Sequence, residues 1–285
     1  MLVLTTDFHG TSRNSVQIKA TLEKIAGAGF THVHWGHEGG GSYLYSQHEM
    51  LQIREWCGGF GLKVKGVHTP SGERNSDLKD YASTNEYNRL AGVELIKNRV
   101  DLAYILEAQG IIVHLKLPWQ LMEKEGFSED YLKITYKTFD ELEPYCKTRH
   151  IRLCVENVYT LPSLGCQIFD ALCRRYDSDF MGFCFDTGHA CVHCKENQLV
   201  YAERYNDRMF MIHIHDNHGV TDEHLIPFEG VFDWEGFAKV LARSPYSLPI
   251  LVESMNEAGE EDVTWLKRAF EAGNRFTAKV ENLRA

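Results

Sequence analysis

Short apolar runs alternate with longer amphipathic stretches along the whole of this 285-residue chain. Each run is rich in β-branched or aromatic residues, and helical spacing of apolar positions follows most clearly in residues 16–27, 84–108 and 129–147. Eight such units without a Pro/Gly/Ser-rich linker predict parallel strands joined by right-handed helical crossovers, in one domain spanning residues 1–285. The predicted strands occupy residues 2–6, 31–36, 63–68, 111–117, 152–157, 181–186, 210–216 and 249–254.

Two architectures accommodate eight β/α units, a closed barrel and an open doubly wound sheet. No Gly-rich phosphate loop follows the first predicted strand, and polar residues fall at the strand ends, which converge on one mouth in a barrel. Gly29 and Gly110 stand where two helices are expected to stop before the next strand. We therefore predict an α/β fold, a single (β/α)8 TIM barrel.

Metal ligands or acid/base groups stand at the ends of six consecutive predicted strands. A single histidine beside a strand is more often a satisfied structural residue, but several carboxylates buried together are costly unless a cation or protons neutralise them. Carboxylates with an imidazole suit Mn²⁺, Mg²⁺, Co²⁺ or Zn²⁺ better than Ca²⁺. A metal-free polar pocket remains the alternative. The strand-end residues are His68, His114, Glu156, Asp186, His213 with His215 on the same face, and Glu253.

Composition narrows the class of protein. The net charge of −10 argues against a nucleic-acid partner, which usually meets a basic face. The sequence begins MLVLTTDFHG without a positive leader, and no run of about 18 apolar residues could span a membrane. The eight cysteines show no disulfide framework, and Cys191-x-x-Cys194 has no second such pair. We expect reduced thiols, no membrane association and a cytoplasmic location.

Three motifs in order carry a family resemblance across nearly the whole chain. They are FDTGHA (185–190), HIHDN (213–217) and DEHLIPFEG (222–230), followed by VES (252–254). Together they resemble the sugar isomerase/epimerase superfamily of xylose isomerase-like TIM barrels, which is related to apurinic endonuclease IV. The resemblance implies one metal ion held by Glu156, Asp186, His213 and Glu253. His213 is chosen over His215 because His213 and Asp216 match the superfamily's His-x-x-acid pattern.

The resemblance also implies an activity. We expect a divalent-metal-dependent isomerase or epimerase acting on a sugar or sugar-like polyol, by proton abstraction through a metal-stabilised enediolate, with Glu156 and Glu253 as catalytic residues. His189, His68 and Trp35 are the predicted substrate-binding residues. Asn217-His218-Gly219 stands where tagatose 3-epimerase-like enzymes place an arginine, so that sugar contact is in doubt. A small-molecule sugar is the expected partner, and a homo-oligomer is compatible with it.

Two other functions compete with sugar chemistry. An endonuclease IV-like hydrolase of abasic DNA would hold up to three zinc ions, with His68, His114, His189, Asp222 and His224 as second-metal ligands rather than substrate contacts. Against it stand the net charge and the segment 68–83, whose few cations are offset by acidic residues. A non-catalytic barrel that binds a metal and a sugar is the third function, although two glutamates flanking the site exceed what binding needs.

Overall fold

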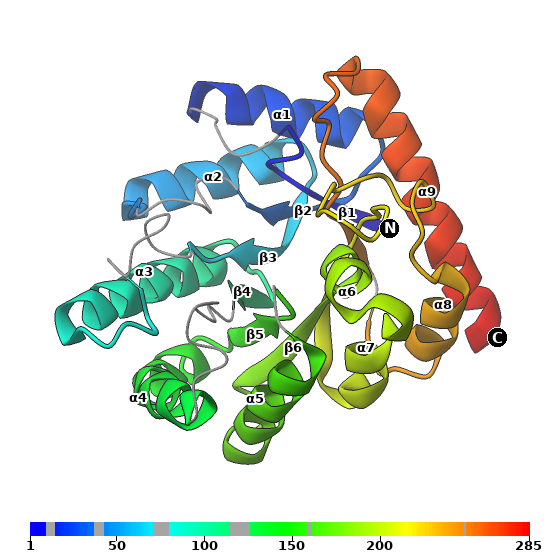
Figure 1. Ribbon diagram of the computed structural model, residues 1–285. Coiled ribbons are helices and arrows are strands. Elements are labelled where there is room, and N and C mark those ends of the chain that lie inside the picture. The colour runs from blue at the N-terminus through cyan, green and yellow to red at the C-terminus, as the bar shows by residue number, and fades with distance from the viewer. Residues whose placement is uncertain (10–14, 37–42, 71–79, 115–125, 159–160, 248) are drawn as a thin grey trace.

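Eight parallel strands form a closed barrel in which each strand pairs with its neighbours in chain order, and β8 pairs with β1 (Figure 1). This confirms the predicted α/β class and (β/α)8 TIM barrel. The computed structural model describes residues 1–9, 15–36, 43–70, 80–114, 126–158, 161–247 and 249–285. The strands are β1 Leu2–Thr5, β2 His32–Trp35, β3 Lys63–His68, β4 Gly110–His114, β5 Arg152–Glu156, β6 Met181–Asp186, β7 Met209–Ile214 and β8 Ile250–Val252.

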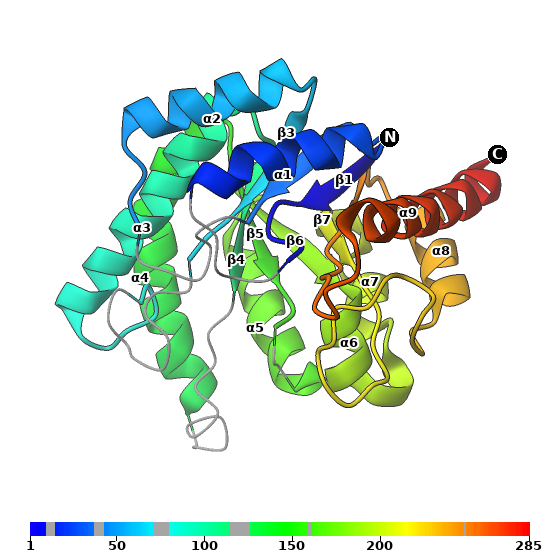
Figure 2. The ribbon, with the colours of Figure 1, turned by 90° about the horizontal axis from the view of Figure 1, so that it is seen from above.

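Helices surround this ring of strands in both views (Figures 1 and 2). The helices predicted at 16–27, 84–108 and 129–147 are confirmed as α1, α3 and α4. The helices are α1 Ser15–Gly27, α2 Gln47–Gly59, α3 Glu86–Ile105, α4 Phe127–Lys147, α5 Pro162–Arg175, α6 Thr187–Cys194, α7 Val200–Arg204, α8 Trp234–Ala242 and α9 Asp262–Arg284, with 3₁₀ turns η2 Lys195–Asn197 and η3 Asn206–Arg208.

Of the two predicted glycine stops, only one is confirmed. Gly29 follows α1 with φ +99, a left-handed conformation that suits glycine. Gly110 is instead the first residue of β4, and α3 has already ended at Ile105. Glu107 takes the left-handed conformation there, with φ 57. The error arose because Gly110 lies where the helical pattern stops, although the chain turns three residues earlier.

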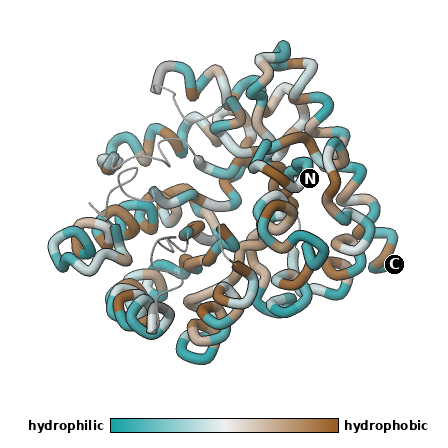
Figure 3. Tube along the Cα trace, viewed as in Figure 1, coloured by the Kyte–Doolittle hydropathy of each residue, from teal (hydrophilic) through white to brown (hydrophobic). Residues whose placement is uncertain are grey.

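Strand alternation decides which side chains enter the barrel. The register pairs His114 with Glu156 and Asp186 with His213, while Glu156 itself pairs with Cys184 on β6. The side chains of Glu156, Asp186 and His213 point inward and meet inside the barrel. A small apolar layer lies beneath them, made of Ile112, Cys154, Cys184 and Met211. The outward faces of the strands pack against the helices in the main core. Along each element, hydrophobic and hydrophilic residues alternate (Figure 3). The fold thus supports a polar layer on an apolar floor.

No helix within the described residues is long and apolar enough to cross a bilayer.

Candidate metal centre

Four side chains from neighbouring strands meet at one point of the barrel mouth. Glu156, Asp186 and His213 belong to β5, β6 and β7, and Glu253 directly follows β8. One ligand atom from each lies within 4.8 Å of those of the other three. His213 Nδ1 is 2.9 Å from Glu253 Oε2, 3.4 Å from Glu156 Oε1 and 3.8 Å from Asp186 Oδ2. The structure therefore brings together the four predicted metal ligands.

Unsatisfied polar atoms in this group fit a cation. In the part of the chain that the structure describes, Oε2 of Glu156 and both ring nitrogens of His213 make no hydrogen bond. His213 Nδ1 nevertheless lies within ion-pair distance of Glu156, Asp186 and Glu253, although none of these approaches has hydrogen-bond geometry. Buried polar atoms without a partner are costly. Ligand atoms that face one another closely without bonding are arranged as a divalent ion requires, so the residues present fit such an ion.

The electrostatics of the centre favour ionised carboxyl groups at Glu156 and Asp186. Burial opposes charge on Glu156, but His213 and His114 outweigh it and hold the pKa of this carboxyl well below its usual range. Burial likewise opposes charge on Asp186, and His189 and His215 lower its pKa. Burial opposes protonation of His213, yet Cys184, Glu253 and Glu156 raise its pKa well above the usual value. In the metal-free protein, a proton held on His213 therefore partly balances the negative charge of these carboxylates. A bound cation would displace that proton.

A second group extends the centre toward β3 and β4. His68, His114 and Glu156 form a further set of three ligand atoms within 4.8 Å of one another. His114 Nε2 lies 3.2 Å and His68 Nε2 lies 3.8 Å from Glu156 Oε2. His68 Nδ1 lies 2.9 Å from the carbonyl oxygen of Thr69 and is placed to donate to it, which turns Nε2 toward the glutamate. Glu156 thus faces both groups.

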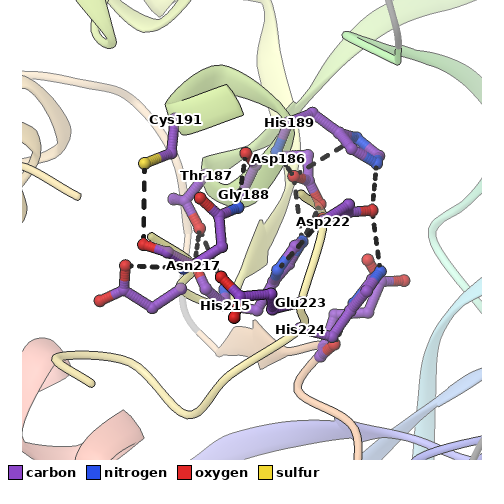
Figure 4. A network of polar contacts seen from close by, with 12 residues as sticks. Asp186, Thr187, Gly188, His189, Cys191, His215, Asn217, Asp222, Glu223 and His224 are labelled. Carbon is purple, nitrogen blue, oxygen red and sulfur yellow. Dashed lines mark hydrogen bonds and ion pairs between the residues drawn. The ribbon is translucent and has the colours of Figure 1, made fainter. Parts of the chain in front are cut away.

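A third group consists of His189 on α6 with Asp222 and His224 on the loop after β7. Asp222 lies between two imidazoles (Figure 4), with Oδ2 3.2 Å from His189 Nε2 and 3.1 Å from His224 Nε2. His189 Nδ1 is in turn 3.2 Å from Glu156 Oε1, which connects this group to the four-residue centre. Burial opposes protonation of His224, but Asp222 outweighs it and raises its pKa to about 9. The nine residues predicted as ligands of a one-metal or a three-metal site therefore lie in one connected cluster.

His215 has a role that the sequence did not assign. Its Nε2 lies 3.0 and 3.1 Å from the two oxygens of Asp186, and its ring stacks on that of His224 with centroids 4.0 Å apart. A Cβ on Gly188 would lie 1.9 Å from the His215 ring, so only glycine fits beside it. His215 is thus buried between the four-residue centre and the third group, where it fixes the orientation of Asp186.

Asp216 is the other residue whose role the sequence missed. Its buried carboxylate accepts hydrogen bonds from the backbone N–H of Asn217, Phe228 and Phe232 and from Trp234 Nε1. The carboxylate therefore organises the loop that carries Asp222 and His224. The position of Asp216, two residues after the end of β7 and out of phase with His213 and His215, was the available signal.

The structure does not support the predicted sugar contact of Trp35. Its side chain is 1% exposed and its Nε1 donates to the Tyr45 hydroxyl at 3.0 Å. His34, the preceding residue, lies 5.2 Å from His213 between ring centroids and so occupies the barrel interior. Because side chains alternate along a strand, Trp35 faces the helices and packs in the core. His68 and His189 do lie at the mouth.

Comparison with known proteins places the chain among barrels of one family. The family model for xylose isomerase-like TIM barrels matches residues 22–270. An uncharacterized protein of Sinorhizobium fredii, y4fM, is 31% identical over 94% of this chain and 91% of its own length. An uncharacterized Methanocaldococcus jannaschii protein, MJ1311, is 25% identical over 93% of this chain and 89% of its own length.

Solved structures share the fold at low sequence identity. A D-tagatose 3-epimerase-like protein superimposes with a TM-score of 0.74 at 20% identity, covering 99% of this chain and 98% of that one. An L-ribulose 3-epimerase superimposes with a TM-score of 0.73 at 14% identity, covering 100% and 98%. At these identities the likeness establishes the architecture.

Proposed function

Because the chain belongs to the xylose isomerase-like TIM barrel family, we propose that it is a divalent-metal-dependent isomerase or epimerase of a sugar or polyol. The observation that carries the proposal is the convergence of Glu156, Asp186, His213 and Glu253 on one point. Buried atoms of Glu156 and His213 in this centre make no hydrogen bond within the described residues. The solved structures that it resembles include proteins named as 3-epimerases of psicose and ribulose, which supports a sugar substrate.

The proposed metal ligands are these four residues, and Mn²⁺, Mg²⁺, Co²⁺ or Zn²⁺ suits their mixture of oxygen and nitrogen. Such an ion would stabilise the negative charge that develops on a substrate oxygen when the neighbouring carbon loses a proton. The residues of the three groups are carboxylates and imidazoles, and they include no lysine or arginine to bind a phosphate ester. We therefore propose an unphosphorylated substrate.

The chain's own residues would move the proton. One of the two glutamates removes it from the carbon beside the carbonyl, and the other returns a proton to the opposite face or to the neighbouring carbon. Glu253 has a 10% exposed side chain and Glu156 a 1% exposed one, so Glu253 is better placed to reach a substrate. His189 and His68, both at the mouth, would orient substrate hydroxyls. Asp222, shared by two imidazoles, would fix His189.

A second function is favoured by a specific observation. Beside the four-residue centre, His68–His114–Glu156 and His215–His224–Glu253 each offer three ligand atoms within 4.8 Å of one another, as a site for further metal ions would require. An endonuclease IV-like hydrolase of abasic DNA is therefore the alternative. Three ions per chain and incision of an abasic duplex would favour it over sugar chemistry.

The test is proton exchange. The metal-loaded protein is incubated in deuterated water with D-tagatose, D-psicose, L-ribulose and related ketoses or polyol derivatives, and deuterium at carbon is followed by NMR and mass spectrometry. We expect carbon-bound deuterium in at least one substrate and its loss after chelation. No exchange with any sugar, together with incision of abasic DNA, would replace the proposal with the hydrolase.

A further inference from the structure

A buried lysine lies at the opposite end of the barrel from the metal centre. Lys65 is 3% exposed; its Nζ donates to Gln109 Oε1 at 2.6 Å and lies 5.5 Å from the centroid of the Tyr246 ring. Among the described residues its polar and charged neighbours are this amide, this ring, the Cys154 thiol and His32, and none of them is a carboxylate. Burial lowers its pKa to about 8, so most of it remains charged at neutral pH. A buried cation without a counter-ion is costly.

A cavity of about 210 Å³ adjoins this lysine. Both groups that hold the ammonium, Gln109 and Tyr246, belong to its wall, and the exposed Gln109 and Ser247 lie at its solvent side. Its lining residues come from the first residues of β5 and β7 and from the segments before β4 and β8, so the cavity opens at the N-terminal ends of the strands. They are Gln109, Arg152, Cys154, Phe210, Met211, Pro245, Tyr246 and Ser247.

One cation lines the cavity itself. Arg152 donates through Nε to the carbonyl of Ser178 at 2.9 Å, and its guanidinium lies 4.3 Å from the centroid of the Phe210 ring. No carboxylate contacts it in the described residues. By contrast, Arg149, which lines a larger cavity of about 620 Å³ on the outer side of α2 and α3, already pairs with Asp101 at 2.8 Å.

We propose that the cavity binds a small oxyanion, a carboxylate or phosphate group, on Arg152, with the ammonium of Lys65 behind the wall formed by Gln109 and Tyr246. A guanidinium stacked on an aromatic ring offers its remaining N–H groups to an oxyanion, and the anion's charge would partly compensate the buried ammonium nearby. Phe210, Met211 and Tyr246 provide an apolar wall for a short organic body. Acidic residues predominate in this chain of net charge −10, so a cation in the wall with a second one directly behind it distinguishes this cavity.

The site is separate from the proposed metal centre and does not depend on the proposed function. Cys154 and Met211 line the cavity and also belong to the apolar layer under the four-residue centre. A bound anion would therefore contact the floor of the metal centre without sharing a ligand with it.

The experiment is calorimetric titration with sodium phosphate and with sodium acetate at constant ionic strength. The protein is titrated as purified and again after chelation, because phosphate also binds metal ions. We expect saturable binding of one anion per chain that survives chelation. In Arg152→Gln the affinity should fall at least about tenfold, as expected for loss of a charge-assisted hydrogen bond, and in Lys65→Met it should fall measurably because a nearby positive charge is lost.

Lys133→Met is the matched control, because Lys133 is exposed on α4 and, within the described part of the chain, pairs with Asp130 alone. Its binding should equal that of the wild type. Preference for phosphate or for acetate identifies the anion, and either supports the site. If Lys65→Met does not fold, Arg152→Gln decides. Absence of saturable binding for both anions, or unchanged binding in the variants that fold, overturns the proposal.

Discussion

At the scale of single residues, the two glutamates of the centre differ in their surroundings. Glu156 is buried among His68, His114 and His189, whereas Glu253 contacts His213 and remains slightly exposed. Under the proposed function Glu156 would therefore chiefly bind the cation, and removing it would leave several imidazoles without a counter-charge. Glu253 combines proximity to the cation with access from the mouth, which is the combination that a proton-transfer group needs.

Glu253→Gln should lower turnover by roughly two to four orders of magnitude, the usual contribution of a general acid or base. The amide has the same shape but no basic oxygen. Deuterium exchange into substrate measures the loss, and circular dichroism checks that the fold is retained. Glu257→Gln is the control, because Glu257 is exposed and only a few residues away. Turnover of Glu253→Gln equal to that of the control would remove Glu253 from the mechanism.

His215→Asn should weaken metal binding by roughly 10- to 100-fold, as is typical when a partner of a metal ligand is lost. Asp186 would lose the imidazole that lies 3.0 Å from it and would no longer be held in one orientation. Competition with a chromogenic chelator measures the affinity. His218→Asn is the control, since His218 is exposed and contacts Glu223 alone among the described residues. Equal affinities in the two variants would contradict the positioning role.

At the scale of elements, the strands position the proposed metal ligands, and the loop after β7 places Asp222 and His224 beside them. The sequence could predict the strands because each contains a short apolar run with a polar group near its end. It could predict that Glu156, Asp186, His213 and Glu253 meet because alternation puts every second residue inward. Trp35 was misplaced because β2 begins at His32, and the register between β2 and β3 shifts between Val33 and His34. Only the assembled barrel shows which face is inward there.

Contacts between distant segments were beyond prediction from the sequence for a related reason. The stacking of His215 on His224 and the contact of Asp222 with His189 depend on how the loop after β7 folds back over α6. That path is set by Asp216, which also exchanges two backbone hydrogen bonds with Leu225. No local pattern encodes it.

Asp216→Ala should destabilise the protein by at least about 3 kcal/mol, because several buried donors lose a charged acceptor at once. Urea unfolding measures the change. Asp233→Ala is the comparison, since Asp233 caps α8 by accepting from the backbone N–H of Gly236 and its loss should cost only about 1 kcal/mol. A smaller effect at Asp216 than at Asp233 would show that the loop does not depend on this carboxylate.

At the scale of the whole molecule, the barrel mouth holds many ionisable groups close together. Their contribution to the free energy of unfolding would differ between the metal-free protein and the protein with a bound cation. In the metal-free state the pKa values of His189, His213 and His224 are raised, in each case because nearby acidic groups outweigh burial. A raised pKa means that the folded state holds a proton more tightly than the unfolded one. This contribution to stability is complete below pH 6.5 and is lost as pH rises toward the folded values.

The metal-free protein should therefore lose stability between pH 6.5 and about 8, as seen by its thermal midpoint. Above that range Lys65 acts in the opposite direction, because burial lowers its pKa to about 8. With a divalent ion present the trend should reverse, since metal binding displaces those protons and strengthens as pH rises. A metal-free midpoint that climbs from pH 6.5 to 8 would be inconsistent with the protonated histidines.

The most direct test of the account is the metal content of the chain. Metal-free protein is dialysed against Mn²⁺, Co²⁺ or Zn²⁺ and measured by elemental analysis, beside a variant that carries His213→Ala and Glu253→Gln. The account predicts one tightly bound ion per chain in the wild type and its loss in the double variant, while circular dichroism shows both folded. A wild-type chain that retains no divalent ion, or a double variant that retains the same amount, would contradict it.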